Sequence, residues 1–167
     1  YGNRAVLKNF YPMLVLLGSL MLTGCATAIA TAGSGLAGNL NTAILNQDDP
    51  QLVRDGAPAY LLMLDSFVEG APENVAALSA AAELYSAYGV VFVDDPIRAK
   101  KLTNRGRKYG QRALCAARKE ACDIWSLNYG EFTEQLNAID KKQVEALYTF
   151  GLSWIAYIQA HSDDWSA

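Results

Sequence analysis

The sequence has little of what most enzyme active sites are made of. Its 167 residues include one histidine, His161, and three cysteines, and no glycine-rich phosphate loop or serine or cysteine nucleophile motif occurs. With a single histidine, a Ser-His-Asp or Cys-His site has almost nothing to be built from. His161 stands near Asp163 and Asp164, but three such residues at a helix end are more often solvated polar groups than metal ligands. We therefore expect no catalytic residues, no metal site and no cofactor.

Patterns typical of β-strands and of membrane-spanning helices are also missing. No alternating runs of Val, Ile and Thr bounded by Asn-Gly turns occur, so we predict an all-α protein. The apolar run at residues 13–22 is ten residues long, whereas a helix needs about 20 apolar residues to cross ~30 Å of hydrocarbon. Ten residues fit the apolar core of a secretory signal instead.

The end of this run has the pattern of a bacterial lipoprotein signal. Leu22-Thr23-Gly24-Cys25 closes the apolar core, and Arg4 and Lys8 supply the positive flank before it. The thiol of Cys25 would take a diacylglycerol, and acyl chains anchor a protein at about 0.8 kcal/mol per buried CH₂. A plain signal peptide with an unrelated cysteine, or a buried core segment, is the alternative. We predict lipidation at Cys25.

Three regions follow from this prediction. They are a lipoprotein signal peptide at residues 1–24, a lipid-anchored flexible tether at 25–34, and a helical domain at 35–167. The tether is rich in Ala, Gly, Ser and Thr and carries no charge. Export places the protein in the periplasm, and Ala26 in place of an aspartate after the cysteine favours the outer membrane. Residues 162–167 resemble a helix start cut short, so we expect the domain to be the N-terminal part of a longer one.

Charge is unevenly distributed along the chain. Residues 25–167 carry 12 basic and 17 acidic side chains, a net charge of −5 that gives no general attraction to nucleic acid. Nine basic residues nevertheless fall within one predicted helix and its end, without an intervening acid: Arg98, Lys100, Lys101, Arg105, Arg107, Lys108, Arg112, Arg118 and Lys119. Such a basic helix can bind anionic headgroups or an acidic partner protein, or it can simply be a solvated face. Nucleic acid is not a sensible partner for an exported protein.

Helical periodicity accounts for most of residues 35–167. Asp49-Pro50 and Asp95-Pro96 each combine an N-cap aspartate with proline at the first helical position. Gly56 and Pro58 predict a kink or break in the helix that Asp49 starts. Its buried stripe should be Leu61, Leu64 and Val68, with Leu62 beside it. The expected helices cover residues 35–45, 50–68, 72–92, 96–118 and 140–159.

The last of these helices should be central in the fold. Asp140 is its expected N-cap, and its sequence is apolar nearly all round. One buried face is expected to hold Val144, Leu147, Gly151, Trp154, Ile155 and Ile158. Residues 121–139 lack a long period and predict a connector with short helical turns.

Helices of similar length joined by short turns suggest an α-solenoid of antiparallel helix pairs. The tetratricopeptide signature is not cleanly present, so the repeat would be degenerate, and an irregular helical bundle would give the same pattern.

Cys115 and Cys122 would lie ~10.5 Å apart in one continuous helix, too far for a disulfide, which needs roughly 4.4–6.8 Å between Cα atoms. A disulfide, which an oxidising compartment favours, requires the chain to turn back near Arg118; the alternative is two buried thiols.

Six aromatic side chains stand at positions where helices pair. Their spacing places most of them in the core, and several could instead line an internal groove for an apolar ligand. They are Tyr85, Tyr88, Tyr109, Tyr148, Trp154 and Tyr157.

The order of several short segments resembles the T-component lipoproteins of TRAP transporters. These segments are DPQLVRDGAPAYLL at 49–62, APEN at 71–74, AAELYSAYG at 81–89, YGQRALC at 109–115 and DWSA at 164–167. The resemblance implies a degenerate tetratricopeptide-like solenoid, tethered by lipid in the periplasm and assembling as a homotrimer. It also implies an accessory that docks the solute-binding protein of the transporter and passes a small, hydrophobic ligand, with no catalytic residues. A scaffold lipoprotein for envelope assembly, binding no solute, is the alternative function.

Overall fold

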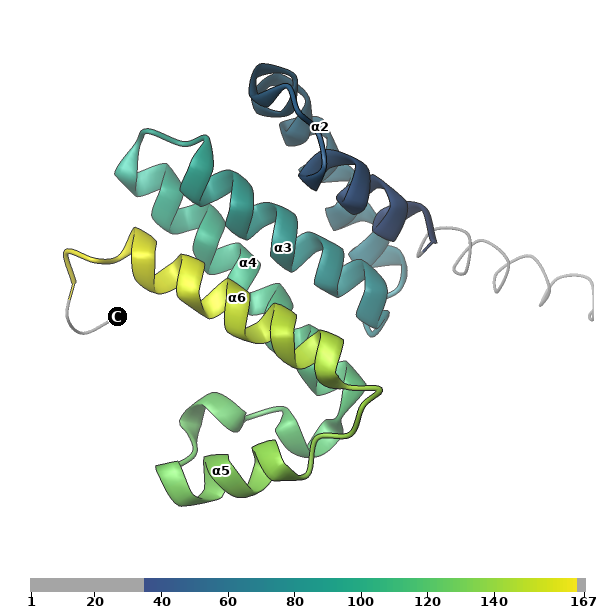
Figure 1. Ribbon diagram of the computed structural model, residues 1–167, viewed down its shortest axis with the longest axis vertical. Helices are drawn as coiled ribbons and strands as arrows, with labels where there is room; N and C mark the ends of the chain where they lie inside the picture. Colours follow the sequence, from purple (N-terminus) through teal and green to yellow (C-terminus); the bar gives the residue numbers. More distant parts are fainter. Residues whose placement is uncertain (1–34, 165–167) are drawn as a thin grey trace, which may run out of the picture. The chain divides into compact units, whose positions relative to one another are not determined.

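The computed structural model describes residues 35–164, and this part of the chain is helical apart from turns (Figure 1). The all-α prediction is confirmed. A helix over residues 35–45 is followed by α2 (Pro50–Gly70), α3 (Val75–Val91), α4 (Pro96–Ala117), two 3₁₀ turns η1 (Lys119–Ala121) and η2 (Ile124–Ser126), α5 (Tyr129–Asn137) and α6 (Val144–Ala160). The predicted signal, tether and lipidation site lie outside the described residues.

The two Asp-Pro pairs start helices as predicted. The Asp49 carboxylate accepts hydrogen bonds from two backbone N–H groups in the first turn of α2, at 3.0 and 3.1 Å. Asp95 does the same for α4, at 2.8 and 3.2 Å. Pro50 and Pro96 take the first helical positions, where an N–H group would have no partner within the helix.

Two other helix starts differ from the prediction. α3 begins at Val75 rather than at residue 72, because Asn74 caps it by accepting a hydrogen bond from the N–H of Ala77 at 3.0 Å. The prediction that Asp140 caps α6 is wrong, since that helix begins at Val144. The Asp140 carboxylate instead accepts a hydrogen bond from the backbone N–H two residues later, at 2.8 Å. Aspartate makes this local bond readily in turns, and the bond competes with helix capping.

A kink or a break was predicted around Pro58, and the break does not occur, because α2 is assigned as one helix through Pro58. Proline has no N–H group, so the carbonyl of Arg54, four residues earlier, loses its helical hydrogen bond. The hydroxyl of Tyr88 on α3 donates to that carbonyl at 3.1 Å. A side chain from another helix therefore satisfies the group that Pro58 leaves free.

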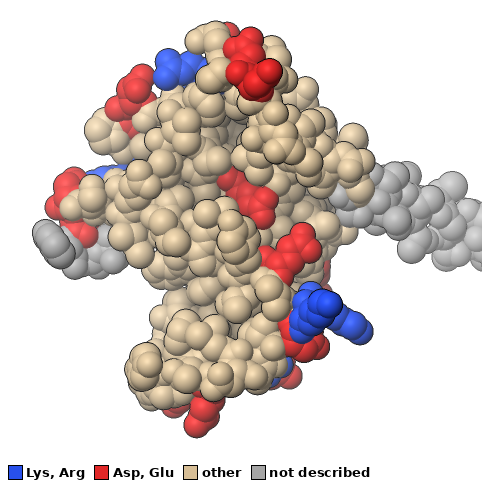
Figure 2. Space-filling model, in the orientation of Figure 1, with Lys and Arg blue, Asp and Glu red and all other residues tan. Residues whose placement is uncertain are grey.

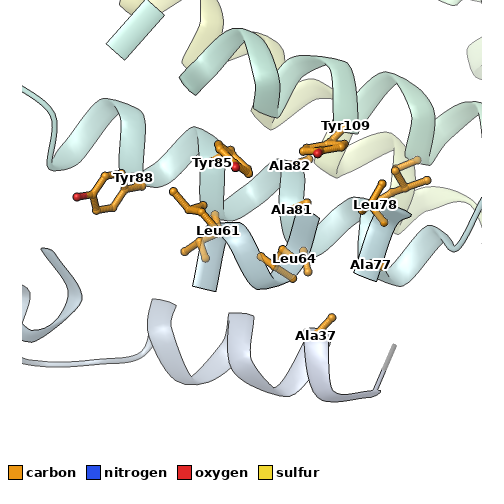
Figure 3. Close-up of a cluster of buried hydrophobic side chains, with 14 of the residues drawn as sticks. Ala37, Leu61, Leu64, Ala77, Leu78, Ala81, Ala82, Tyr85, Tyr88 and Tyr109 are labelled. Atoms are coloured by element: carbon orange, nitrogen blue, oxygen red, sulfur yellow. The ribbon is translucent and has the colours of Figure 1, made fainter. Parts of the chain in front are cut away.

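α3 is the central helix of the described domain. It packs against α2, α4 and α6, and it is buried on nearly all sides from Ala77 to Gly89. Leu61, Leu64 and Val68 of α2 cover one side of it, as predicted, whereas Leu62 points outward and is 71% exposed. Figure 3 shows side chains of the resulting core, which consists largely of alanines and leucines together with three buried tyrosines.

Glycines let α3, α4 and α6 approach closely. A Cβ atom added at Gly106 of α4 would clash with Ser86 Oγ and lie 3.0 Å from the backbone of α3. One added at Gly110 would clash with Ser153 Oγ of α6. α4 therefore crosses both neighbours at distances that only glycine permits.

The connector between α4 and α6 is held by its own small core. α4 ends at Ala117, the chain turns back through η1 and η2, and α5 follows with a capping box made by Asn128 and Glu131. This agrees with the predicted connector of short helical turns. Five buried side chains join it to α4 and α6: Leu114, Ala121, Ile124, Ala146 and Phe150.

Candidate docking surface

The side of α6 that faces away from α3 and α4 is an exposed apolar row. Its residues recur every three or four positions and therefore share one helix face. Each is between 37% and 66% exposed. We call this row the α6 outer face: Val144, Tyr148, Leu152, Ile155 and Ile158.

This exposure corrects the prediction that α6 is central and buries Val144, Ile155 and Ile158. The buried row of α6 consists of smaller side chains together with Phe150, namely Ala146, Thr149, Phe150, Ser153 and Ala156. Small side chains fit against the glycines of α4, and the large aliphatic ones do not. The α6 helix is therefore apolar on two sides, but only one of them packs against the domain.

The described domain has three apolar grooves between its helices, and the first of them lies beside this face. The first, about 180 Å³, runs between α3 and α6 and is lined by Val90, Leu152 and Ile155. The second, about 240 Å³, lies between the 35–45 helix and the C-terminal half of α3, where Tyr88 and Val91 line it. The third, about 210 Å³, separates the 35–45 helix from α2. Leu45 lines the first and second grooves, which places them next to each other.

One carboxylate lines the first groove. Glu83 accepts hydrogen bonds from Asn41 Nδ2 at 2.6 Å and from Thr149 Oγ1 at 2.9 Å, so it joins the 35–45 helix, α3 and α6. It is the single charged residue of α3. Glu83 is not among the residues predicted from the sequence, although one acid within an alanine-rich buried helix is a signal that could have found it.

Few charges interrupt this side of the molecule. In Figure 2, drawn in the orientation of Figure 1 with α6 toward the viewer, most of the surface is neither acidic nor basic. Contiguous apolar patches on soluble proteins usually mark a binding surface. The geometry is thus that of a docking surface with small adjoining grooves.

The model of one protein family, the TRAP transporter T-component, matches residues 46–167. This chain belongs to the TRAP transporter T-component family. This family consists of transporter components and is not a family of enzymes. Among curated proteins and among solved structures, nothing matches the sequence. Within residues 35–164 of this T-component, every helix is too short or too polar to cross a bilayer.

The six aromatic residues considered for an internal groove lie in separate places in the T-component. Tyr85 and Tyr109 form a pair in the core, and Tyr88 caps the free carbonyl in α2 while lining the second groove. Trp154 and Tyr157 lie half-buried on α6, and Tyr148 belongs to the exposed α6 outer face. They do not surround one cavity.

Tyr85 and Tyr109 share one carboxylate. Their hydroxyls donate to the two oxygens of Asp65 at 2.8 and 2.6 Å, and Arg105 Nη2 lies 2.8 Å from Asp65 Oδ2. The guanidinium also lies over both tyrosine rings, 5.3 and 5.8 Å from their centroids. This cluster ties α2, α3 and α4 together. Asp65, one residue beyond the buried Leu64, is a second site residue that was not predicted from the sequence.

The cluster keeps both tyrosines neutral. Burial, followed by hydrogen bonding to Asp65, raises the pKa of Tyr85 and of Tyr109 above the usual value. The hydrogen bond to Tyr109 raises the pKa of Arg105, which stays positive. Both tyrosines hold their protons more tightly than free tyrosine does, so the cluster has the properties of a structural tie.

The other predicted residues also hold elements in place. Cys115 and Cys122 are joined by a disulfide, with their Cα atoms 4.2 Å apart, where the chain leaves α4 and turns back. Arg107 of α4 lies over the rings of Trp154 and Tyr157, at 4.8 and 4.6 Å. His161 stacks on Tyr157 with centroids 4.0 Å apart, and no metal-binding group of three His, Cys, Asp or Glu side chains occurs in residues 35–164.

Proposed function

We propose that this T-component is a periplasmic accessory protein of a TRAP-type transporter that docks the solute-binding protein of that transporter. The family supplies the transporter context. The exposed α6 outer face is the main observation behind the proposed docking. Covering large aliphatic side chains with a partner removes apolar surface from water, which lowers the free energy of the complex.

The grooves support contact with a protein better than enclosure of a whole solute. At 180 to 240 Å³ each, they are smaller than the roughly 300–1,000 Å³ pockets that enclose drug-sized ligands. They fit the apolar side chains of a docked helix or loop. A small hydrophobic ligand would pass through this region with walls contributed by the docked partner.

The proposal includes the anchor and the architecture inferred from the sequence. Lipidation at Cys25 would tether residues 35–167 to a membrane, with the outer membrane favoured, through the segment 25–34. Consecutive packing of α2, α3 and α4 through four-residue turns supports a degenerate tetratricopeptide-like solenoid. A homotrimer would present three α6 outer faces to its partners.

The test is capture from periplasmic extract with Cys25→Ser protein as bait. A second bait adds Ile155→Gln and Ile158→Gln, which make the α6 outer face polar while both side chains remain in solvent. A matched control carries Leu62→Gln and Ile97→Gln, at residues that are 71% and 78% exposed on other helices. Mass spectrometry identifies the retained proteins.

The proposal predicts that a TRAP solute-binding protein is retained by the first bait and the control and lost from the α6 variant. Retention of envelope-assembly proteins alone would support the scaffold function in its place. A solute-binding protein held equally by all three baits would place its contact elsewhere on the T-component.

A further inference from the structure

One face of α4 is positively charged along its whole length. Its residues are spaced three or four apart, so they share one side of the helix, and all are exposed. From first to last they span about 21 Å at 1.5 Å per residue. We call this row the α4 basic face: Arg98, Lys101, Arg105, Lys108 and Arg112.

Much of this charge is not used within the domain. Arg105 pairs with Asp65, and Arg112 donates to the carbonyl of Pro72 at 3.0 Å. Within residues 35–164, Arg98, Lys101 and Lys108 make no side-chain hydrogen bond or ion pair. Two further cations of α4 with partners in the domain lie to the side of this row: Lys100 bonds Asp163, and Arg107 lies over aromatic rings of α6.

The α4 basic face lacks the anchors that a protein interface needs. Protein interfaces obtain most of their affinity from a few aromatic or aliphatic side chains that fill pockets in the partner. Ile97, in the first turn of α4, is the one large apolar side chain of this helix that is exposed, at 78%. Four turns of long cationic side chains without apolar ones between them suit a surface covered with anionic groups.

We propose that the α4 basic face binds the anionic phospholipid headgroups of a membrane, with α4 lying along the surface. Lys ammonium and Arg guanidinium groups would contact lipid phosphates, and Ile97 would reach the interface at one end. This surface goes beyond the proposed docking function and rests on it only for the presence of a nearby membrane. Basic residues that face anionic headgroups are a common second contact of lipid-anchored proteins with a membrane. The side drawn in Figure 2, which carries few lysines and arginines, would stay free for a partner.

The test compares how the full chain partitions to vesicles of phosphatidylcholine and to vesicles of equal phosphatidylcholine and phosphatidylglycerol. Acyl chains and apolar residues contribute equally to binding at both kinds of vesicle, so their contributions cancel in the ratio of the two partition constants. The variant carries Lys101→Gln and Lys108→Gln, two side chains without partners in the domain. The matched control, Lys141→Gln with Lys142→Gln, removes the same charge from exposed positions outside α4.

Each cation near an anionic surface contributes roughly a fivefold change in binding, so the α4 variant should lower the ratio roughly 25-fold. The control should change it less than about twofold, because distant charges are screened by salt. Equal losses in both variants would overturn the proposal, since net charge would then be responsible. A wild-type ratio near one would overturn it as well, and binding of soluble poly-glutamate through Lys101 and Lys108 would then identify an acidic protein as the occupant.

Discussion

Gly106 offers a direct test of the close packing between α3 and α4. Gly106→Ala adds one methyl group where α4 crosses α3. That methyl would clash with Ser86 Oγ and lie 3.0 Å from both the carbonyl oxygen of Ala82 and the backbone nitrogen of Ser86. Backbone atoms cannot rotate away, so the helices must separate. Overpacking of this kind lowers the free energy of unfolding by about 3 kcal/mol. The better helix propensity of alanine offsets about 1 kcal/mol of this loss.

The matched control is Gly151→Ala, an identical change within α6 at a glycine with no heavy atom within 4 Å of the added Cβ. Here only helix propensity acts, and stability should rise by up to about 1 kcal/mol. Urea denaturation followed by far-UV circular dichroism gives both values. We expect Gly106→Ala to be less stable than wild type by about 2 kcal/mol. If both substitutions were stabilising, α3 and α4 would not cross at the distance described.

Two further predictions concern the ties between helices. The pKa of Tyr85 and of Tyr109 is raised in the folded state, so their contribution to stability is complete below pH ~10, where the unfolded chain also keeps these protons, and is lost as the pH rises above that value. Tyr85→Phe should therefore make the urea midpoint fall less steeply between pH 9 and 11, and an unchanged slope would contradict the role of this cluster. Cys115→Ser with Cys122→Ser should lower the free energy of unfolding by about 2 kcal/mol, because the short disulfide loop is opened. A reducing agent should produce the same loss in wild type and none in the double variant, and a wild-type stability that does not change on reduction would refute the prediction.

Features set by neighbouring residues could be predicted from the sequence. Asp49 and Asp95 cap helices because the hydrogen bonds involved reach only two or three residues along the chain. The α2 stripe of Leu61, Leu64 and Val68 was also predictable, because these large aliphatic side chains recur at three- and four-residue spacing. The predicted break at Pro58 failed for the opposite reason: the group that rescues the helix, the Tyr88 hydroxyl, comes from 30 residues away.

The orientation of α6 could not be obtained from periodicity. Both sides of that helix are apolar, so the pattern does not say which one is buried. The choice is made by Gly110 on α4, which accepts Ser153 and its small neighbours and leaves no room for Ile155. The candidate docking surface was missed for the same reason, because its residues were assigned to the core. The cluster around Asp65 depends on three helices at once, and local spacing does not reveal it.

The proposed docking function would place separate selective constraints on the two rows of α6. Its inner row of small side chains must match the glycines of α4, whereas its outer row touches little of the domain and can change without altering the fold. Substitutions at Tyr148, Leu152 or Ile155 could therefore redirect this protein to a different partner at almost no expense in folding. Related T-components that serve different transporters should then diverge at these outer positions while keeping the inner ones small. A single helix would in this way let partner choice evolve independently of the scaffold.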